Sequence, residues 1–214
     1  MTFDEQRAKM VNTQLKARGL TDERLLAAFG KVPRHLFVPE EFRDEAYADH
    51  PLPIGAGQTI SQPYIVALMV DCLGLRGHER VLEIGSGSGY QTAILSELAL
   101  EVFSVERMPE LLQAVQVRLS TLGYLNVHLA AGNGSLGWPE HAPFDAIIVS
   151  AAAPRMPLPL VEQLAEGGRM AIPVGVAQSQ MLIQAEKRRG ALHQKEIASC
   201  VFVPLIGEHG WSHE

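Results

Sequence analysis

The residues best suited to chemistry form a glycine-rich turn near the middle of the chain. An apolar run, Val81-Leu82-Glu83-Ile84, leads into Gly85-Ser86-Gly87-Ser88-Gly89-Tyr90. Glycine permits positive φ angles and lets a ligand approach the backbone without meeting a Cβ atom. A strand before this turn and a helix after it would bring the helix N-terminus to the ligand. The turn therefore predicts a small-molecule site, although a plain tight connection between strand and helix is the alternative.

The spacing of the glycines narrows the class of ligand. Dinucleotide-binding turns usually read GxGxxG, whereas this turn reads GxGxG, with Tyr90 in the place of the third glycine. The pattern resembles the first motif of S-adenosylmethionine methyltransferases, whose ligand has no pyrophosphate. This resemblance implies that Gly85, Ser86, Gly87 and Ser88 contact S-adenosylmethionine.

Two acidic residues accompany the turn. Glu106 ends the next predicted strand, 21 residues after Gly85, where a carboxylate can accept hydrogen bonds from both ribose hydroxyls. Its alternative role is a favourable charge near the helix that starts at Pro109. Glu83 could meet the cationic amino group of the methionine part, or it could be a polar residue at a strand end.

The surrounding sequence alternates between strand and helix patterns, which predicts an α/β fold with a doubly wound, mainly parallel sheet. The predicted helices cover 63–73, 90–98 and 109–122, and the strands cover 80–84, 101–106, 127–130, 145–150 and 169–174. Two later strands, 180–186 and 192–202, should be antiparallel around Arg189-Gly190. We expect one domain with three parts: an N-terminal helical and irregular cover (1–57), a cofactor-binding core (58–176) and C-terminal strands (177–214).

Three further stretches resemble one methyltransferase family. They read GQTISQPY at 57–64, PFDAIIVSAAAP at 143–154 and EGGRMAIPVG at 166–175. With VPR at 32–34 and FVPL at 202–205, they are similar to the protein-L-isoaspartate O-methyltransferases over nearly the whole chain. The resemblance implies methyl transfer from S-adenosylmethionine to the free α-carboxylate of L-isoaspartyl residues in damaged proteins. The methyl ester then collapses to a succinimide, and S-adenosylhomocysteine is the other product.

The resemblance also assigns roles to individual residues. Ser61 matches the family's active-site serine, and its hydroxyl would orient the substrate carboxylate. Because Pro63 follows it, Ser61 could instead be a helix cap. Ile60 and Gln62 would line the cofactor pocket. We expect the extended substrate peptide to contact Thr59, Tyr64, Val203, Pro204 and Leu205. An α-carboxylate has a pKa near 3.5, so it is already ionised at neutral pH and needs no general base.

One position departs from the family pattern. The family usually has Gly-Asp-Gly where this chain has Gly132-Asn133-Gly134, and the Asp would accept a hydrogen bond from the adenine amino group. We expect Asn133 and Gly134 to contact the cofactor, with a loss of about 1 kcal/mol compared with Asp. The alternative is a turn pair that tolerates left-handed backbone.

Composition limits the partners. The net charge of −6 gives no basic face for nucleic acid, and the short cluster Lys187-Arg188-Arg189 fits a solvated hairpin tip. The eight histidines have no ligand spacing, so we expect no metal. No apolar run is long enough to span a membrane. Two isolated cysteines, Cys72 and Cys200, favour a reducing compartment. We therefore expect a cytoplasmic monomer.

Other functions remain open at the level of the sequence. A methyltransferase acting on a small molecule, or on a nucleic-acid base, would share the glycine turn. Base-methylating enzymes commonly carry an Asn/Asp-Pro-Pro-aromatic loop, and the stretch Ser150–Pro154 lacks those polar groups. A non-catalytic S-adenosylmethionine-binding module is a second alternative, and the GxGxG spacing opposes a third, an NAD-dependent oxidoreductase.

Overall fold

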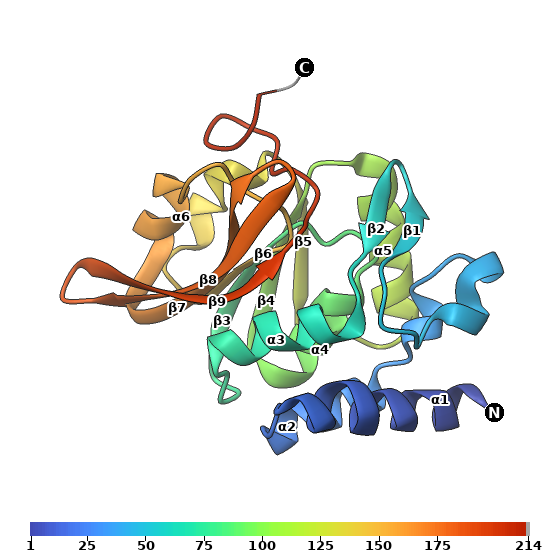
Figure 1. Cartoon of the computed structure of the whole chain (residues 1–214). Coiled ribbons are helices and arrows are strands. Elements are labelled where there is room, and N and C mark those ends of the chain that lie inside the picture. The colour runs from blue at the N-terminus through green and yellow to red at the C-terminus, as the bar shows by residue number, and fades with distance from the viewer. Residues whose placement is uncertain (213–214) are drawn as a thin grey trace.

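The computed structural model describes residues 1–212 and contains a central seven-stranded sheet (Figure 1). The strand order is β5-β4-β3-β6-β7-β8-β9. Pairs from β5 to β7 are parallel, whereas β7–β8 and β8–β9 are antiparallel. The strands are β3 (Arg80–Ile84), β4 (Glu101–Glu106), β5 (Val127–Ala131), β6 (Phe144–Val149), β7 (Leu164–Val176), β8 (Ser179–Arg188) and β9 (Ala191–Cys200). The predicted doubly wound α/β class is confirmed.

The central strands are apolar on both faces because each face has its own core. Val81 and Leu82 are adjacent in β3, yet they belong to different clusters of buried residues. This follows from the alternation of side chains along a strand. One cluster is shared with α3 (Pro63–Leu73), α4 (Tyr90–Leu98) and α5 (Pro109–Thr121), and the other with α6 (Leu158–Gln163). Strands covered on both faces are mainly apolar and buried along most of their length, as in β3 and β6.

The predicted core helices match α3, α4 and α5 closely, but some boundaries differ. Helix α6 lies outside every predicted element, because its six residues are too short for a helical period. Strand β7 begins at Leu164 rather than 169, and its pairing with β6 is irregular between Leu164 and Arg169. The strand predicted for 192–202 ends at Cys200, because the amide of Phe202 turns to the side-chain carbonyl of Gln180 at 2.8 Å.

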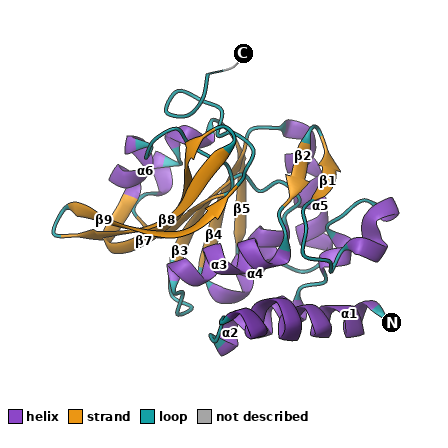
Figure 2. Cartoon of the chain, in the orientation of Figure 1, coloured by secondary structure: helices purple, strands orange, loops and turns teal. Residues whose placement is uncertain are grey.

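The N-terminal cover consists of two α-helices, three short 3-10 turns and a hairpin (Figure 2). Helix α1 (Phe3–Met10) continues through one π-helical turn, and α2 (Glu23–Lys31) is capped by Asp22. The 3-10 turns are Lys16–Arg18, Arg34–Leu36 and Glu40–Glu45. The hairpin pairs β1 (Leu52–Gly55) with β2 (Gln58–Ile60). The irregular part of the cover is therefore ordered, and it ends beside the first residues of α3.

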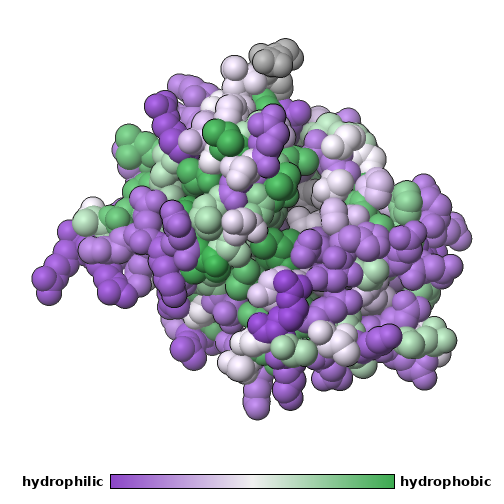
Figure 3. Space-filling view, viewed as in Figure 1, coloured by the Kyte–Doolittle hydropathy of each residue, from purple (hydrophilic) through white to green (hydrophobic). Residues whose placement is uncertain are grey.

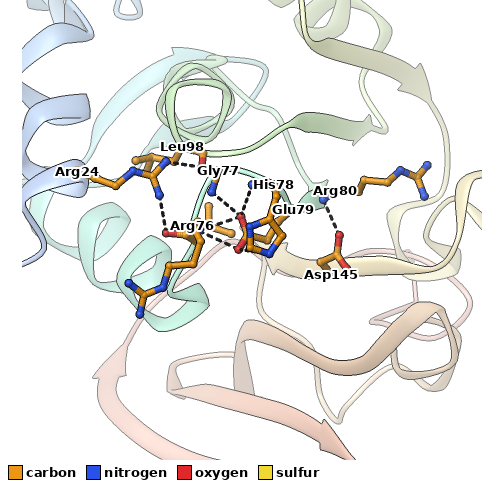
Figure 4. A network of polar contacts seen from close by, with 9 residues as sticks. Arg24, Arg76, Gly77, His78, Glu79, Arg80, Leu98 and Asp145 are labelled. Carbon is orange, nitrogen blue, oxygen red and sulfur yellow. Dashed lines mark hydrogen bonds and ion pairs between the residues drawn. The ribbon is translucent and has the colours of Figure 1, made fainter.

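Arg24 in α2 connects the cover to the ends of two core helices through hydrogen bonds to main-chain carbonyls. Its guanidinium donates to the carbonyl oxygens of Leu75 (3.0 Å) and Leu98 (3.3 Å), beyond α3 and at the end of α4 (Figure 4). Next to it, the carboxylate of Glu79 accepts hydrogen bonds from successive backbone amides of 76–78. This network joins helix ends far from the glycine turn.

The β8–β9 hairpin extends away from the body of the sheet, at the left in Figure 1, and its tip is hydrophilic in Figure 3. Arg189 and Gly190 form the turn with positive φ, as the sequence predicted. The side chain of Lys187 is not in the solvated position that we predicted for the hairpin tip. Its ammonium group donates to the carbonyl oxygens of Val161 and Leu164 at the end of α6. Within residues 1–212, no helix is long and apolar enough to cross a membrane.

Candidate active site

The parallel strands end at one edge of the sheet, and a cavity of about 350 Å³ opens there. The β1–β2 hairpin, the start of α4 and the C-terminal segment complete its wall at the same end of the molecule (Figure 1). Strand order reverses between β3 and β6, and ligands of open α/β sheets bind in the crevice at such a point. The lining residues are Gln58, Thr59, Ile60, Ser61, Val66, Ile84, Gly85, Ser86, Gly87, Ser88, Tyr90, Gln91, Val105, Glu106, Arg107, Met108, Gly134, Ser150, Ala151, Val203, Pro204, Leu205 and Ile206.

The glycine turn has the strained backbone that its composition predicts. Gly85, Gly87 and Gly89 have φ angles of 88°, 52° and 84°, which side-chain-bearing residues rarely adopt. A Cβ atom on Gly89 would lie 3.0 Å from Cγ1 of Val115, so close packing against α5 also requires glycine there. The hydroxyl of Ser86 is buried and has no hydrogen-bond partner within the described residues. Because Ser86 lines the cavity, a ligand is the natural partner of this hydroxyl.

Glu106 joins the end of β4 to the glycine turn. Its Oε2 accepts from the amide of Gly87 at 3.0 Å, and its Oε1 accepts from the amide of Met108 at 3.0 Å. These bonds hold the buried carboxylate in one orientation on the cavity wall. Each carboxylate oxygen has further acceptor capacity. The geometry is therefore compatible with the predicted ribose contact, and the bond to Met108 also places the carboxylate at the start of α5, the alternative role that we considered.

Ser61 lies in the turn between β2 and α3 and lines the cavity. It does not occupy the N-cap position of α3. The residue that precedes the helix is Gln62, and the amide of Tyr64 is capped by Asp49 at 3.2 Å. The hydroxyl of Ser61 makes no hydrogen bond to any part of the chain that the structure describes. The helix-cap alternative for Ser61 is therefore not what the structure contains, and its hydroxyl is left for a ligand.

Glu83 is placed differently from our prediction of a direct ligand contact. It is fully buried behind the glycine turn and does not line the cavity. Its carboxylate accepts from Gln91 Nε2 (3.0 Å), Thr92 Oγ1 (2.6 Å) and Ser104 Oγ (2.6 Å). Burial raises the pKa of Glu83 to about 7, against the effect of these hydrogen bonds. Its side chain points under α4, so Gln91, which also donates to Ser150 at 2.7 Å, is the group presented to the cavity.

Asn133 and Gly134 stand at the far end of the site. Gly134 lines the cavity, and a Cβ there would clash with Ile84. Asn133 lies in an adjoining open hollow with Arg107, Met108 and Trp211. Its Oδ1 accepts from the backbone amide of Ser135 at 3.1 Å and from its hydroxyl at 2.8 Å. Asn133 therefore caps the short 3-10 turn Gly134–Leu136. The left-handed turn pair that we considered is not formed, because Asn133 has φ −78° and Gly134 is not among the residues with positive φ.

The other predicted contacts divide into two groups. Thr59, Ile60 and the C-terminal residues 203–205 line the cavity. The C-terminal segment is held there by a parallel bridge between Ala152 and Pro204. Gln62 and Tyr64 do not line the cavity, although Val66, further along α3, does. The ring of Tyr64 is instead covered by the guanidinium of Arg18, 3.3 Å from its centroid.

Sequence reasoning missed several lining residues. Ser150 directly follows β6, and Arg107 and Met108 follow β4. All three stand at carboxyl ends of parallel strands, and that position was the available signal. Gln91 had no such signal, because its importance depends on the buried carboxylate of Glu83 beneath it.

The fold and site together define an S-adenosylmethionine-dependent methyltransferase. They combine a parallel sheet whose strand order reverses at β3 and β6, a GxGxG turn after β3 and a carboxylate at the end of β4. Comparison with known proteins specifies the family. A sequence profile of the family described as "Protein-L-isoaspartate(D-aspartate) O-methyltransferase (PCMT)" matches residues 5–210. The chain belongs to this protein-L-isoaspartate O-methyltransferase family, as its motifs predicted.

Individual relatives match almost the whole length of this chain. The protein-L-isoaspartate O-methyltransferase of Syntrophus aciditrophicus is 53% identical over 213 residues, with 98% of each chain covered. That of Trichlorobacter lovleyi is 54% identical over 212 residues, covering 99% of this chain and 98% of the relative. A solved protein-L-isoaspartate O-methyltransferase superposes with a TM-score of 0.85 at 30% identity, covering 95% of this chain and 67% of the other.

A Plasmodium falciparum structure, described as a putative enzyme of this type in complex with S-adenosyl-L-homocysteine, has a TM-score of 0.79 at 27% identity. The match covers 94% of this chain and 98% of that one.

Proposed function

We propose that this chain transfers the methyl group of S-adenosylmethionine to the free α-carboxylate of L-isoaspartyl residues, and so starts the repair of damaged proteins and peptides. The observation that carries the proposal is the meeting of two motifs in one cavity. The family-specific turn with Ser61 lines the same cavity as the glycine turn and Glu106. A site for the methyl donor and a free hydroxyl for the acceptor therefore share one cavity.

The chain's own residues bind and orient in this reaction. Bound S-adenosylmethionine supplies a methyl group on a positively charged sulfur. The glycine turn, Ser86 and Glu106 hold the donor, and Gln91 and Ser150 offer polar groups at the end of β6. Ser61 donates a hydrogen bond to the substrate carboxylate, while residues 203–205 border the extended peptide. Because the nucleophile is already ionised, orientation of the two reactants contributes most to catalysis. It can lower the activation free energy by about 7–11 kcal/mol.

The test is a pair of peptides that differ only in one linkage. We expect methylation of an L-isoaspartyl peptide and formation of a base-labile ester, with no methylation of its normal aspartyl twin. Equal methylation of both peptides would contradict the proposed specificity. If neither peptide reacts while S-adenosylmethionine binds with micromolar affinity, the chain is a binding module or acts on another acceptor.

We also infer that the chain acts as a monomer in the cytoplasm. The proposed reaction uses the glycine turn, Glu106 and Ser61, and it calls for no residue from a second copy. Cys72 and Cys200 are both free thiols, and burial raises the pKa of each to about 11. Thiols that stay protonated are poor nucleophiles, which suits a reducing compartment where neither needs a disulfide.

A further inference from the structure

Arg34 is a buried cation without a carboxylate partner. Its side chain is completely buried, and no ion pair of Arg34 is formed within residues 1–212. The desolvation lowers its pKa to about 10, so the guanidinium is still charged at neutral pH. Burying an unpaired charge opposes folding, and apolar residues of similar volume often stabilise such a position instead. The core alone does not explain an arginine here.

The hydrogen bonds of Arg34 connect the cover to the active-site turn. Its Nε donates to the carbonyl oxygen of Ala46 at 2.6 Å, and its Nη2 donates to the carbonyl oxygen of Ser61 at 2.8 Å. The guanidinium carbon also lies 4.9 Å from the centroid of the Tyr90 ring, and Tyr90 lines the cavity. The cation therefore contacts the backs of two walls of the site, without itself lining it.

A second contact holds the other end of the same turn. Asp49 caps α3 at the amide of Tyr64 and pairs with Arg18 at 2.8 Å. The main chain from Ser61 to Tyr64 is thus held from the cover at both ends. The Arg34 bond is the one made by Ser61 itself, and a charged donor makes it stronger than a neutral one.

We propose that Arg34 is a positioning residue, which fixes the main chain of Ser61 so that its hydroxyl faces the substrate carboxylate. This inference rests on the proposed function. Arg34 acts through Ser61 and touches neither substrate nor methyl donor. Loss of the bond frees the Ser61 backbone on one side. The donor site, formed by the glycine turn and Glu106, keeps its own hydrogen bonds.

Two substitutions test the role, with a matched control. Arg34→Met removes the donors and keeps an apolar stem, whereas Arg34→Lys keeps a charge and one donor. Arg24→Met is the control, since Arg24 also bonds two main-chain carbonyls of core segments, but far from Ser61 (Figure 4). We expect Arg34→Met to lower kcat about ten- to hundredfold, as for a lost hydrogen bond to a charged group, with S-adenosylhomocysteine affinity within about twofold. Arg34→Lys should recover part of the loss, and Arg24→Met should keep the wild-type kcat well below its unfolding temperature.

A double-mutant cycle with Ser61→Ala identifies the route of the effect. If Arg34 acts through Ser61, then Arg34→Met should cause little further loss in the Ser61→Ala background. Multiplied losses would overturn the proposal, as would an unchanged kcat in folded Arg34→Met or an equal loss in Arg24→Met. Failure of both Arg34 variants to fold would also overturn it, because Arg34 would then be required for folding.

One readout does not depend on activity. Amide hydrogen exchange of residues 58–66 should be faster in Arg34→Met than in wild type or Arg24→Met. If the wild type fails to methylate the isoaspartyl peptide, the proposed function fails, while this exchange measurement still tests the positioning of the turn. Unchanged exchange in this segment would count against the inference.

Discussion

At the scale of single residues, the site offers hydrogen-bonding groups that have no partner in the chain, rather than a general acid or base. The Ser61 hydroxyl faces the cavity while Asp49 caps the neighbouring helix. The Ser86 hydroxyl is buried without a partner in residues 1–212. Such groups suit a reaction whose nucleophile arrives already charged. These groups orient the reactants by hydrogen bonds and do not act as bases that remove a proton.

Substitution of Ser61 should therefore affect turnover more than donor binding. We expect Ser61→Ala to lower kcat for an isoaspartyl peptide about tenfold or more, since it removes a hydrogen bond to a charged carboxylate. The affinity for S-adenosylhomocysteine, measured by calorimetry, should change little. Wild-type activity in this variant would remove Ser61 from the reacting centre.

Asn133 gives the opposite pattern. Its only side-chain acceptor, Oδ1, already receives two hydrogen bonds from Ser135. In Asn133→Asp, one carboxylate oxygen can keep the turn while the second accepts from the adenine amino group. We expect S-adenosylmethionine to bind about five- to tenfold more tightly, by titration, with kcat nearly unchanged. Unchanged or weaker binding would refute the adenine contact.

At the scale of elements, β3 and α4 are joined by a buried acid. The carboxylate of Glu83 connects β3 to Gln91 and Thr92 in α4, and to Ser104 in β4. Through Gln91 this cluster reaches the cavity wall. Strand β3 therefore contributes to the site in two ways. It leads into the glycine turn that shapes the ligand site, and its buried Glu83 orients α4, the helix that follows this turn.

The buried acid makes stability depend on pH. Burial raises the pKa of Glu83 to about 7, so the folded chain retains a proton that the unfolded chain releases near 4.5. The stability from Glu83 is thus present below about pH 4.5 and is lost as the pH rises to about 7. Glu83→Gln cannot ionise, so the free energy of unfolding should fall less between pH 5 and 8 than in wild type. The difference should be on the order of 1–3 kcal/mol by denaturant titration.

The control for this prediction is the exposed Glu140. Glu140→Gln should keep the wild-type dependence on pH. The pKa of Glu79 is lowered by backbone hydrogen bonds, and its effect on stability falls in more acidic solution, below this window. Equal slopes for wild type and Glu83→Gln would show that Glu83 does not ionise in this range.

At the scale of the whole molecule, three distant parts of the chain meet at the proposed site. The cover supplies Arg34, which supports Ser61, the sheet supplies the donor site, and the C-terminal segment supplies a further part of the wall. We therefore expect a mass near 23.3 kDa by sedimentation equilibrium across micromolar concentrations, with activity per chain independent of concentration. A mass that doubles with concentration, together with rising activity, would contradict the monomer.

Local pattern in the sequence was sufficient for much of this molecule. The alternation of strand and helix, the glycine turn and Glu106 are defined by residues close together in the chain, so periodicity and spacing predict them. The motif around Ser61 indicated the family, and the comparisons confirmed it.

Only the tertiary structure decided what lies behind these motifs. Arg34 bonds Ser61 across 27 positions of sequence, and Asp49 takes the capping role that Ser61 itself could have had. Glu83 belongs to the strand that leads into the glycine turn, yet its side chain lies under α4 rather than in the cavity. Short-range pattern determines which residues a strand presents to each face. Which distant side chain then satisfies a given carbonyl or carboxylate depends on packing, and packing is settled only when the chain has folded.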